Sequence, residues 1–243
     1  MAAGPACVTE CDDHHHSPSV MWGALMLSLQ LALVTTLILL LLSFPLASLL
    51  AFRPFFGRTL LEVVVALPLV LPPTVLGYYV LLLIAPESLL GHLWSSLFDS
   101  SLAFSFAGMV FASVLYSLPF AVQPIQHSLR AIPQSWLELA ELQGLSAKQT
   151  LLQVTLPAAK GGVLVAAALS FAHTMGEFGV VLMVGGSIPG ETKVASIALF
   201  EFVEMQQQSE AWLLSLTLLA LSFVMLSVVY TVNRGVMNMG AGR

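Results

Sequence analysis

Residues 22–52 read WGALMLSLQLALVTTLILLLLSFPLASLLAF, an apolar run without a single charged side chain. An α-helix needs about 20 mostly apolar residues to cross a hydrocarbon core roughly 30 Å thick, so this run is long enough to span a membrane. Its part 37–42, LILLLL, lacks the alternation of polar and apolar residues that marks an outer-membrane β-strand. Because backbone amides find no water in lipid, the run is predicted to be helical.

The composition extends this prediction to the whole chain. Its 243 residues are 58% hydrophobic and 9% charged, with a net charge of −5 and a mean hydropathy of +0.92, values typical of membrane proteins rather than soluble domains. We predict an all-α polytopic transmembrane helical bundle of about five spans, surrounded by membrane lipid and without a nucleic-acid partner. The predicted spans are 22–52, 60–85, 103–122, 162–185 and 211–232.

The positions of Lys and Arg predict the orientation of these spans, because short cytoplasmic loops carry the excess of positive charge. Only Lys193 falls in the set of segments that would lie outside. We therefore expect a multi-pass protein of the cytoplasmic membrane with its N-terminus outside and its C-terminus in the cytoplasm. The residues on the predicted cytoplasmic side are Arg53, Arg58, Arg130, Lys148, Lys160, Arg234 and Arg243.

Residues 1–20 form a predicted extracytoplasmic tail ahead of a single transmembrane domain, 21–243. The tail lacks the basic start and the cleavage site of a secretory signal. It does contain side chains that could bind a metal ion, although we favour a disordered tail without a metal. Because the only two cysteines of the chain lie there, no disulfide framework is predicted. The side chains concerned are Cys7, Cys11, Asp12, Asp13 and His14 to His16.

The second predicted span contains LPLVLPPTVLG at 67–77, with Pro68, Pro72 and Pro73 inside an apolar run. Proline removes a backbone donor and kinks a helix, which lipid tolerates only where protein or a cavity satisfies the freed groups. This span therefore faces either a packing partner or a transport pathway. Gly77 indicates a close approach of another helix.

The fourth predicted span contains SFAHTMGEFGVVLMVGG at 170–186, in which His173 and Glu177 are four residues apart. On a continuous helix the two side chains would share one face. Ionisable groups inside a membrane are costly and usually face the bundle interior or a water-filled path. The pair therefore either fixes helix packing or lines and gates a pathway.

The segment between the third and fourth spans, about 123–161, is predicted to be cytoplasmic and to contain a short amphipathic helix. In SWLELAELQG at 135–144, Ser135 and Glu138 have the spacing of a capping box, and Gly144 can end the helix. Ser146 can cap a second helix that is interrupted at Pro157. A mostly apolar helix without basic residues is unlike one that rests on lipid headgroups, so we expect it to dock on a protein partner.

Several enzyme classes lack their motifs in this chain. There is no GxxxxGK[ST] phosphate loop, no HExxH zinc motif and no GxSxG nucleophile turn. We therefore expect no enzymatic activity, no cofactor and no bound metal ion in this subunit. If transport uses ATP, a separate chain must hydrolyse it.

The cytoplasmic segment resembles the EAA-x3-G-x9-I-x-L-P signature of permease subunits of ATP-binding-cassette importers. Leu139 stands where the first Ala of the signature is usual, and Val154 stands where Ile is usual. The resemblance implies the MetI-like core of a type I importer, with the short helix coupling the spans to an ATPase. The residues that it assigns to coupling are Glu138, Ala140, Glu141, Gly144, Leu145, Leu156 and Pro157.

Three further blocks, LPPTVLG at 71–77, GEFG at 176–179 and IPG-x-T at 188–192, are similar to the molybdate-type permeases within that family. This resemblance covers about 28–232. It implies a homodimer of this chain, two copies of a cytoplasmic ATP-binding subunit and an extracytoplasmic oxyanion-binding protein. The expected function is import of molybdate, or of tungstate.

A dianion binds more favourably to hydroxyl groups, backbone N–H groups and helix N-termini than to carboxylates. Thr74, Ser170 and Thr174 are therefore the candidates for contact with the cargo. An ionised Glu177 would repel an anion, which favours a structural or gating role for it. The complete set of predicted pathway and gate residues is Pro72, Pro73, Thr74, Ser170, His173, Thr174 and Glu177.

Three alternatives remain open at this point. The cargo could be sulfate, whose charge and shape resemble those of molybdate. The chain could be an ion-coupled carrier that uses His173 and Glu177 as a proton relay, although this leaves the amphipathic helix unexplained. The number of spans becomes six if 192–203 re-enters the membrane.

Overall fold

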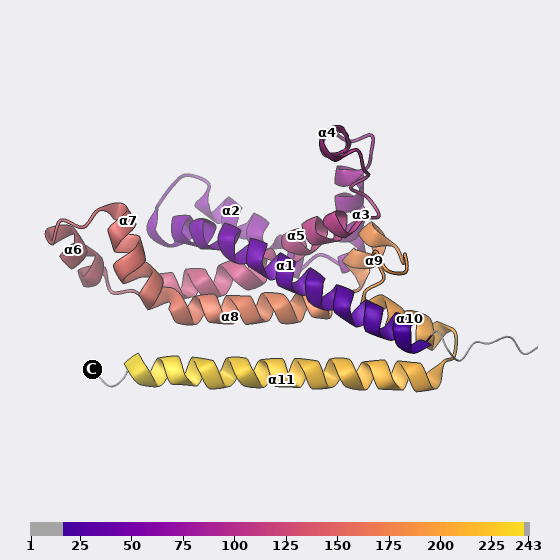
Figure 1. Ribbon diagram of the computed structural model, residues 1–243. Helices are drawn as coiled ribbons and strands as arrows, with labels where there is room; N and C mark the ends of the chain where they lie inside the picture. The colour runs from indigo at the N-terminus through magenta and orange to yellow at the C-terminus, as the bar shows by residue number, and fades with distance from the viewer. Residues whose placement is uncertain (1–16, 241–243) are drawn as a thin grey trace, which may run out of the picture.

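The computed structural model describes residues 17–240, and within that range it contains helices and no strand (Figure 1). The cysteine- and histidine-containing stretch 7–16 lies outside the described residues. The elements, with η1 a 3₁₀ turn and η2 a π turn, are α1 (Ser17–Phe52), α2 (Arg58–Ala66), η1 (Leu67–Leu69), α3 (Pro73–Ile84), α4 (Leu89–Phe98), α5 (Phe106–Arg130), α6 (Gln134–Leu142), α7 (Ala147–Thr150), η2 (Leu151–Thr155), α8 (Leu156–Met175), α9 (Gly179–Gly185), α10 (Ala195–Glu204) and α11 (Gln208–Gly240).

Four of the described helical stretches are long and apolar enough to cross a membrane, and a fifth span is formed if one bent pair of helices counts as a single crossing. The four are Val20–Phe52, Phe106–Arg130, Ala147–Met175 and Gln208–Ser227, and the bent pair is Arg58–Leu69 with Pro73–Ile84. The predicted all-helical bundle of about five spans is confirmed.

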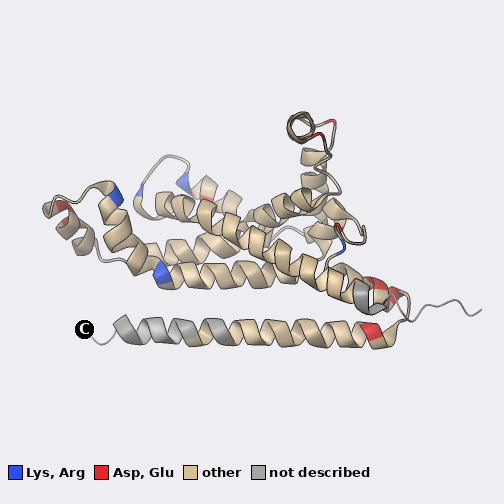
Figure 2. Ribbon diagram, in the orientation of Figure 1, with Lys and Arg blue, Asp and Glu red and all other residues tan. Residues whose placement is uncertain are grey.

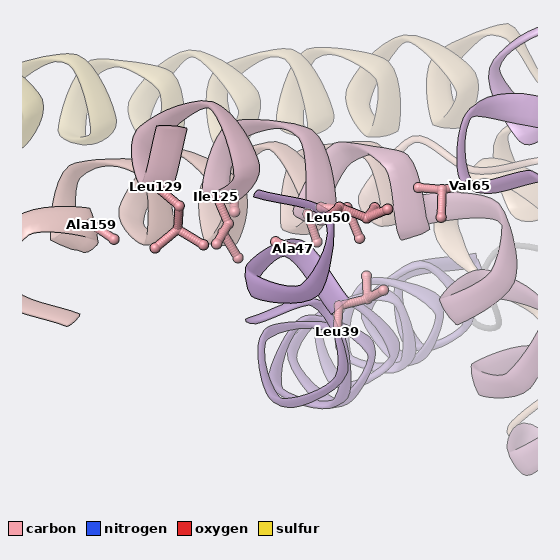
Figure 3. Close-up of a cluster of buried hydrophobic side chains, with 10 residues drawn as sticks. Leu39, Ala47, Leu50, Val65, Ile125, Leu129 and Ala159 are labelled. Atoms are coloured by element: carbon pink, nitrogen blue, oxygen red, sulfur yellow. The ribbon is translucent and has the colours of Figure 1, made fainter. Parts of the chain in front are cut away.

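Helices α1, α5 and α8 pack against one another and form the centre of the bundle (Figure 1). Leu39 and Leu50 of α1 meet Ile125 and Leu129 of α5 in one buried cluster, which Val65 of α2 joins (Figure 3). Each of the first four side chains has no exposed surface. Helix α11 lies beside this centre, in contact with α8 and α10.

The second predicted span is not one kinked helix but two helices that meet at an angle of 112°. Helix α2 runs into the turn η1, and α3 begins at Pro73 after Pro72. Two successive prolines cannot donate backbone hydrogen bonds, and the residue before a proline is held in an extended conformation. The chain therefore restarts as a new helix instead of bending.

Both ends of the segment 123–161 are helical, which shortens the predicted cytoplasmic loop. Helix α5 continues to Arg130, and α7, η2 and α8 form one unbroken stretch from Ala147 to Met175. Pro157 therefore does not interrupt the helix, contrary to the prediction. A proline clashes with the carbonyl group four residues earlier, and the wider π turn Leu151–Thr155 just before it accommodates that clash.

The fourth predicted span is also broken. Helix α8 ends at Met175, and α9 begins at Gly179. Glu177 lies in the break, so the predicted placement of His173 and Glu177 on one helical face is wrong. The glycines at 176 and 179 favour this break because glycine is a poor helix former.

The possible sixth span is the short helix α10. Its 10 residues are too few to cross a bilayer, and it packs against α1 and α11. Phe202 and Ile197 are buried there. Helix α10 is therefore a covering element at the end of the bundle rather than an additional crossing.

Close helix contacts are made at glycines. A Cβ atom on Gly77 of α3 would lie 2.9 Å from the Cβ atom of Met183 in α9, which confirms the predicted close approach at this position. A Cβ atom on Gly162 of α8 would overlap the Ser128 side chain and lie 2.7 Å from the Pro124 carbonyl oxygen in α5. Small residues allow helix backbones to approach this closely in membranes.

We predict that Gly162→Ala destabilises the fold by about 1–3 kcal/mol, the usual cost of an extra methyl group in a packed interior. The control is Gly23→Ala in α1, where the added Cβ atom meets nothing within 4 Å. That control should be neutral or slightly stabilising because alanine favours helix. Thermal unfolding of the detergent-solubilised variants, followed by tryptophan fluorescence, measures both effects. Equal midpoints for the two variants would contradict the predicted contact.

Candidate functional site: a coupling surface and a membrane pocket

Helix α6 lies at one end of the long helices, together with α7 (Figure 1). Its N-cap is Pro133, so Ser135 is the second residue of the helix and does not cap it, contrary to the prediction. Three large apolar side chains on α6 are exposed: Trp136 at 53%, Leu139 at 55% and Leu142 at 85%. Such a surface on a short helix favours contact with another protein.

Gly144 ends α6 as predicted. Its φ angle of 72° lies in the left-handed region, which glycine adopts without steric cost. The N–H of Gly144 donates to the Glu141 carbonyl at 2.9 Å, and the N–H of Leu145 donates to the Ala140 carbonyl at 3.1 Å. These two bonds are the Schellman pattern of a helix C-terminus. They fix the direction in which the chain leaves the exposed helix.

The predicted cap at Ser146 is confirmed. The Ser146 hydroxyl accepts from the Gln149 N–H, and the Gln149 side chain accepts from the Ser146 N–H, forming a capping box. These two hydrogen bonds stabilise the start of α7, and the helix continues through η2 into α8. This stretch connects the exposed helix α6 directly to a spanning helix.

The predicted coupling residues surround this connection but differ in exposure. Ala140 is buried, and Leu145 is half-buried. The others expose their side chains at the end of the bundle. They are Glu138, Glu141, Leu156 and Pro157, along with Gly144 itself.

Positive charge collects at the same end. Figure 2 shows blue segments of Lys and Arg on α7, at the start of α8 and at the connection from α1 to α2, whereas α6 itself is marked red by acidic residues; a further blue segment lies near α9 and α10 at the other end. Beside this group, Glu62 of α2 accepts from Arg130 at 2.6 Å and from Gln126 at 3.0 Å, both of α5. Arg130 also reaches the Leu50 carbonyl of α1 at 3.4 Å. This polar cluster joins α1, α2 and α5.

A pocket of about 590 Å³ lies where the two helix breaks meet. It is lined from α3 by Pro73 and Thr74, from α5 by Tyr116, and from the end of α8 and the following break by His173 and Glu177. Among the residues that the structure describes, no lysine or arginine lines it. Four of the predicted pathway residues are thus brought together by two breaks that are about 100 residues apart in the sequence.

His173 is held in place by α5. Its Nδ1 atom is 2.8 Å from the Ser117 hydroxyl. Its ring stacks on Phe120, with ring centroids 4.1 Å apart, and packs at an angle against Tyr116 at 4.7 Å. No hydrogen bond joins His173 to Glu177.

Glu177 is only 4% exposed. Both of its carboxylate oxygens are buried, and among residues 17–240 only the Ser113 hydroxyl lies beside them, without forming a hydrogen bond of normal geometry. Its backbone carbonyl accepts from the Ser196 hydroxyl of α10 at 2.6 Å. A buried polar group without a partner calls for an explanation, and here the side chain adjoins the pocket.

Three predicted pathway residues do not line this pocket. Ser170 is fully buried inside α8. Thr174 is buried and its hydroxyl lies 3.2 Å from that of Ser117. Pro72 precedes α3 as its N-cap.

Tyr116 and Ser117 were missed by the sequence analysis. They belong to an ordinary apolar stretch of α5 and stand beside no other polar motif. Their spacing with Ser113 and Phe120 places all four residues on one helical face. The sequence does not show that this face lies against the break after α8, and its role at the site depends on that contact.

The segment between α9 and α10, at the end of the bundle opposite α6, is also tightly held. The Thr192 hydroxyl accepts from the Ile188 N–H at 3.0 Å, and Lys193 pairs with Glu201 at 2.6 Å. Ser187 also bonds to Glu201. The N–H of Gly186 donates to the Leu182 carbonyl at 2.9 Å.

Residues 43–238 match the family described as the binding-protein-dependent transport system inner membrane component. The chain is 43% identical over 212 residues to the molybdenum transport system permease protein ModB of Azotobacter vinelandii, covering 87% of this chain and 94% of that one. It is 35% identical over 182 residues to ModB of Haemophilus influenzae, covering 75% and 80%. The sulfate transport system permease protein CysT of Escherichia coli is 30% identical over 177 residues, covering 73% and 64%.

Solved structures share the fold. A chain of a bacterial alginate ABC transporter, in complex with its alginate-bound periplasmic protein, superposes with a TM-score of 0.72 at 14% identity, covering 88% of this chain and 78% of that one. A chain of the MetNI methionine ABC transporter in an inward-facing conformation gives a TM-score of 0.67 at 15% identity, covering 90% and 97%. The helical bundle described above is therefore the fold of ABC importer permeases. Together with the family match over most of its length, this establishes that the chain belongs to the inner membrane components of binding-protein-dependent transport systems, the non-catalytic, multi-pass permease subunits.

Proposed function

We propose that this chain is the permease of an ATP-driven importer that carries molybdate, or the similar dianion tungstate, across the cytoplasmic membrane. The relatives of 43% and 35% identity are both molybdenum permeases. The structural observation that carries the proposal is the exposed apolar helix α6, fixed by Gly144 at the positively charged end of a membrane bundle.

Helix α6 is proposed to dock in a groove of a separate ATP-binding subunit. A short helix that places Leu142 and Trp136 in contact with water is costly to leave uncovered. Because α7, η2 and α8 are continuous, a movement of α6 would be transmitted into a spanning helix. Glu138, Ala140, Glu141, Gly144, Leu145, Leu156 and Pro157 are the proposed coupling residues.

The end that carries α6 is proposed to be cytoplasmic, in keeping with the positive-inside rule. The N-terminus and the loop before α10 would then lie outside, where a binding protein delivers the oxyanion. The C-terminus would lie in the cytoplasm.

The working unit is proposed to be a homodimer with two ATP-binding subunits. Helix α3 lines the pocket with Pro73 and Thr74, and it also exposes Tyr78 at 49% and Tyr79 at 64%. A second copy would cover this exposed face. Pro73, Thr74, His173 and Glu177 are proposed to line the pathway, with Pro72, Ser170 and Thr174 shaping its wall.

A sulfate permease is the second candidate, favoured by the similarity to CysT. An ion-coupled carrier is less well supported, because a proton relay requires His173 and Glu177 to be linked, whereas His173 bonds to Ser117.

We predict that liposomes containing this chain, its ATPase and its binding protein take up molybdate only when ATP is supplied to the ATPase. The measurement is uptake of molybdate, tungstate or sulfate, with ATP hydrolysis followed in parallel. Uptake without the ATPase would contradict the permease function. A response to sulfate alone would keep the importer and change its cargo.

We predict that Leu142→Gln weakens binding of the ATPase subunit by about tenfold or more, since central apolar contacts often contribute about 2 kcal/mol to an interface. The matched control is Leu97→Gln on α4, where a leucine of similar exposure, 75%, lies on a helix placed towards the other end of the bundle. Binding is measured by titrating labelled ATPase onto permease in nanodiscs. An unchanged affinity for Leu142→Gln would contradict docking through α6.

A further inference from the structure

We infer that the pocket between α3, α5 and the break after α8 is a transient binding site for the oxyanion, in which Thr74, Tyr116 and His173 act as neutral hydrogen-bond donors and Glu177 completes the ring of donors. This inference rests on the proposed function and names the part of the pathway that holds the cargo. It adds Tyr116 to the predicted residues and excludes Ser170 and Thr174 from direct contact.

Thr74 offers two donors from one residue. It is the second residue of α3, and its N–H has no backbone acceptor among the described residues, whereas the N–H groups of Val75 and Leu76 donate to the Pro72 carbonyl at 3.0 and 3.1 Å. Thr74 lines the pocket. The positive end of the helix dipole favours an anion at this position.

His173 is oriented by a chain of hydroxyl groups. The Thr174 hydroxyl lies 3.2 Å from that of Ser117, which in turn lies 2.8 Å from His173 Nδ1. If Ser117 donates to Nδ1, the imidazole proton is on Nε2, the nitrogen left to face a ligand. Stacking on Phe120 keeps the ring in this orientation. Ser117 and Thr174 thus act as positioning residues.

Glu177 supplies the independent sign that the pocket holds a ligand. Glu177 lines the pocket, and its two carboxylate oxygens are buried without a well-formed hydrogen bond among the described residues. An ionised carboxylate would repel a dianion, but a carboxyl group that carries its proton donates a hydrogen bond to one. The ligand that satisfies Glu177 in this way is one that only accepts hydrogen bonds, as fully ionised molybdate does.

Within the described part of the chain, neither Lys nor Arg lines the pocket, which suits transport. Neutral donors bind a dianion less tightly than cations do, so that the ion can leave as easily as it enters. Donors without an opposing acceptor also disfavour oxyanions that retain a proton, such as phosphate near neutral pH. The site thereby favours one chemical class of cargo.

The test compares hydroxyl-deleting variants in the assembled importer. Tyr116→Phe and Thr74→Val each remove one donor with little change of shape, and each should lower molybdate uptake per ATP hydrolysed by about tenfold, the effect of one hydrogen bond to a charged group. Tyr230→Phe is the control, because that tyrosine is 68% exposed on α11 and does not line the pocket. Uptake is divided by the amount of assembled complex, so that poorly folding variants are not miscounted.

Glu177 is tested separately. Glu177→Gln retains a donor of nearly the same shape and should keep uptake within about twofold, whereas Glu177→Ala removes the donor and should lose about tenfold. If the Gln variant loses as much as the Ala variant, the negative charge is required and the donor role is wrong.

The outcomes separate this inference from the function on which it rests. If the unmodified importer moves no molybdate, the proposed function fails. If it moves molybdate and Tyr116→Phe and Thr74→Val both match Tyr230→Phe, the function stands and the binding site is wrong.

Discussion

The structure depends on the high energetic cost of unpaired backbone N–H and C=O groups in lipid. Two helix breaks, where such groups occur, lie close together in the bundle. Helix breaks in a membrane survive only where protein or a cavity covers them. The break before α3 and the break after α8 lie against each other, since a Cβ atom on Gly179 would come within 2.9 Å of the Pro73 Cβ atom. Each break therefore shields the other, and the pocket lies between them.

This arrangement connects the two ends of the molecule to the same point. From one end, the exposed helix α6 leads through α7 and η2 into α8, an unbroken helical stretch that ends beside Glu177. From the other end, α10 is tied to α1 by the bond from the Ala195 N–H to the Ser28 hydroxyl at 2.8 Å, and to the break by the Ser196 hydroxyl. A change at either end can therefore reach the pocket through packed helices and hydrogen bonds.

The sequence predicted the features that depend on composition and local chemistry. The apolar runs indicated the helical bundle, Gly144 indicated the end of α6, and Ser146 indicated the start of α7. Local rules gave the wrong helix boundaries at Ser135, where Pro133 is the N-cap instead, and at Pro157 and Glu177. A π turn accommodated the proline, and a break separated the acid from His173.

The pocket itself could be predicted only in part. Thr74, His173 and Glu177 were visible as polar residues in apolar runs, but their proximity depends on the 112° bend between α2 and α3. Tyr116 had no signal in the sequence because tyrosine is common in membrane helices and at their ends. Which threonine and serine hydroxyls reach the pocket depends on helix rotation, which neither composition nor spacing determines.

The central claim is that α6 and the segment before α10 lie on opposite sides of the membrane with the pocket between them. With Cys7 and Cys11, the only cysteines, replaced by serine, single cysteines at the exposed positions Lys148 and Glu191 can be labelled in right-side-out vesicles with a membrane-impermeant thiol reagent. The account predicts that Glu191→Cys reacts in intact vesicles and that Lys148→Cys reacts only after permeabilisation. Reaction of both in intact vesicles, or the reverse order, would contradict it.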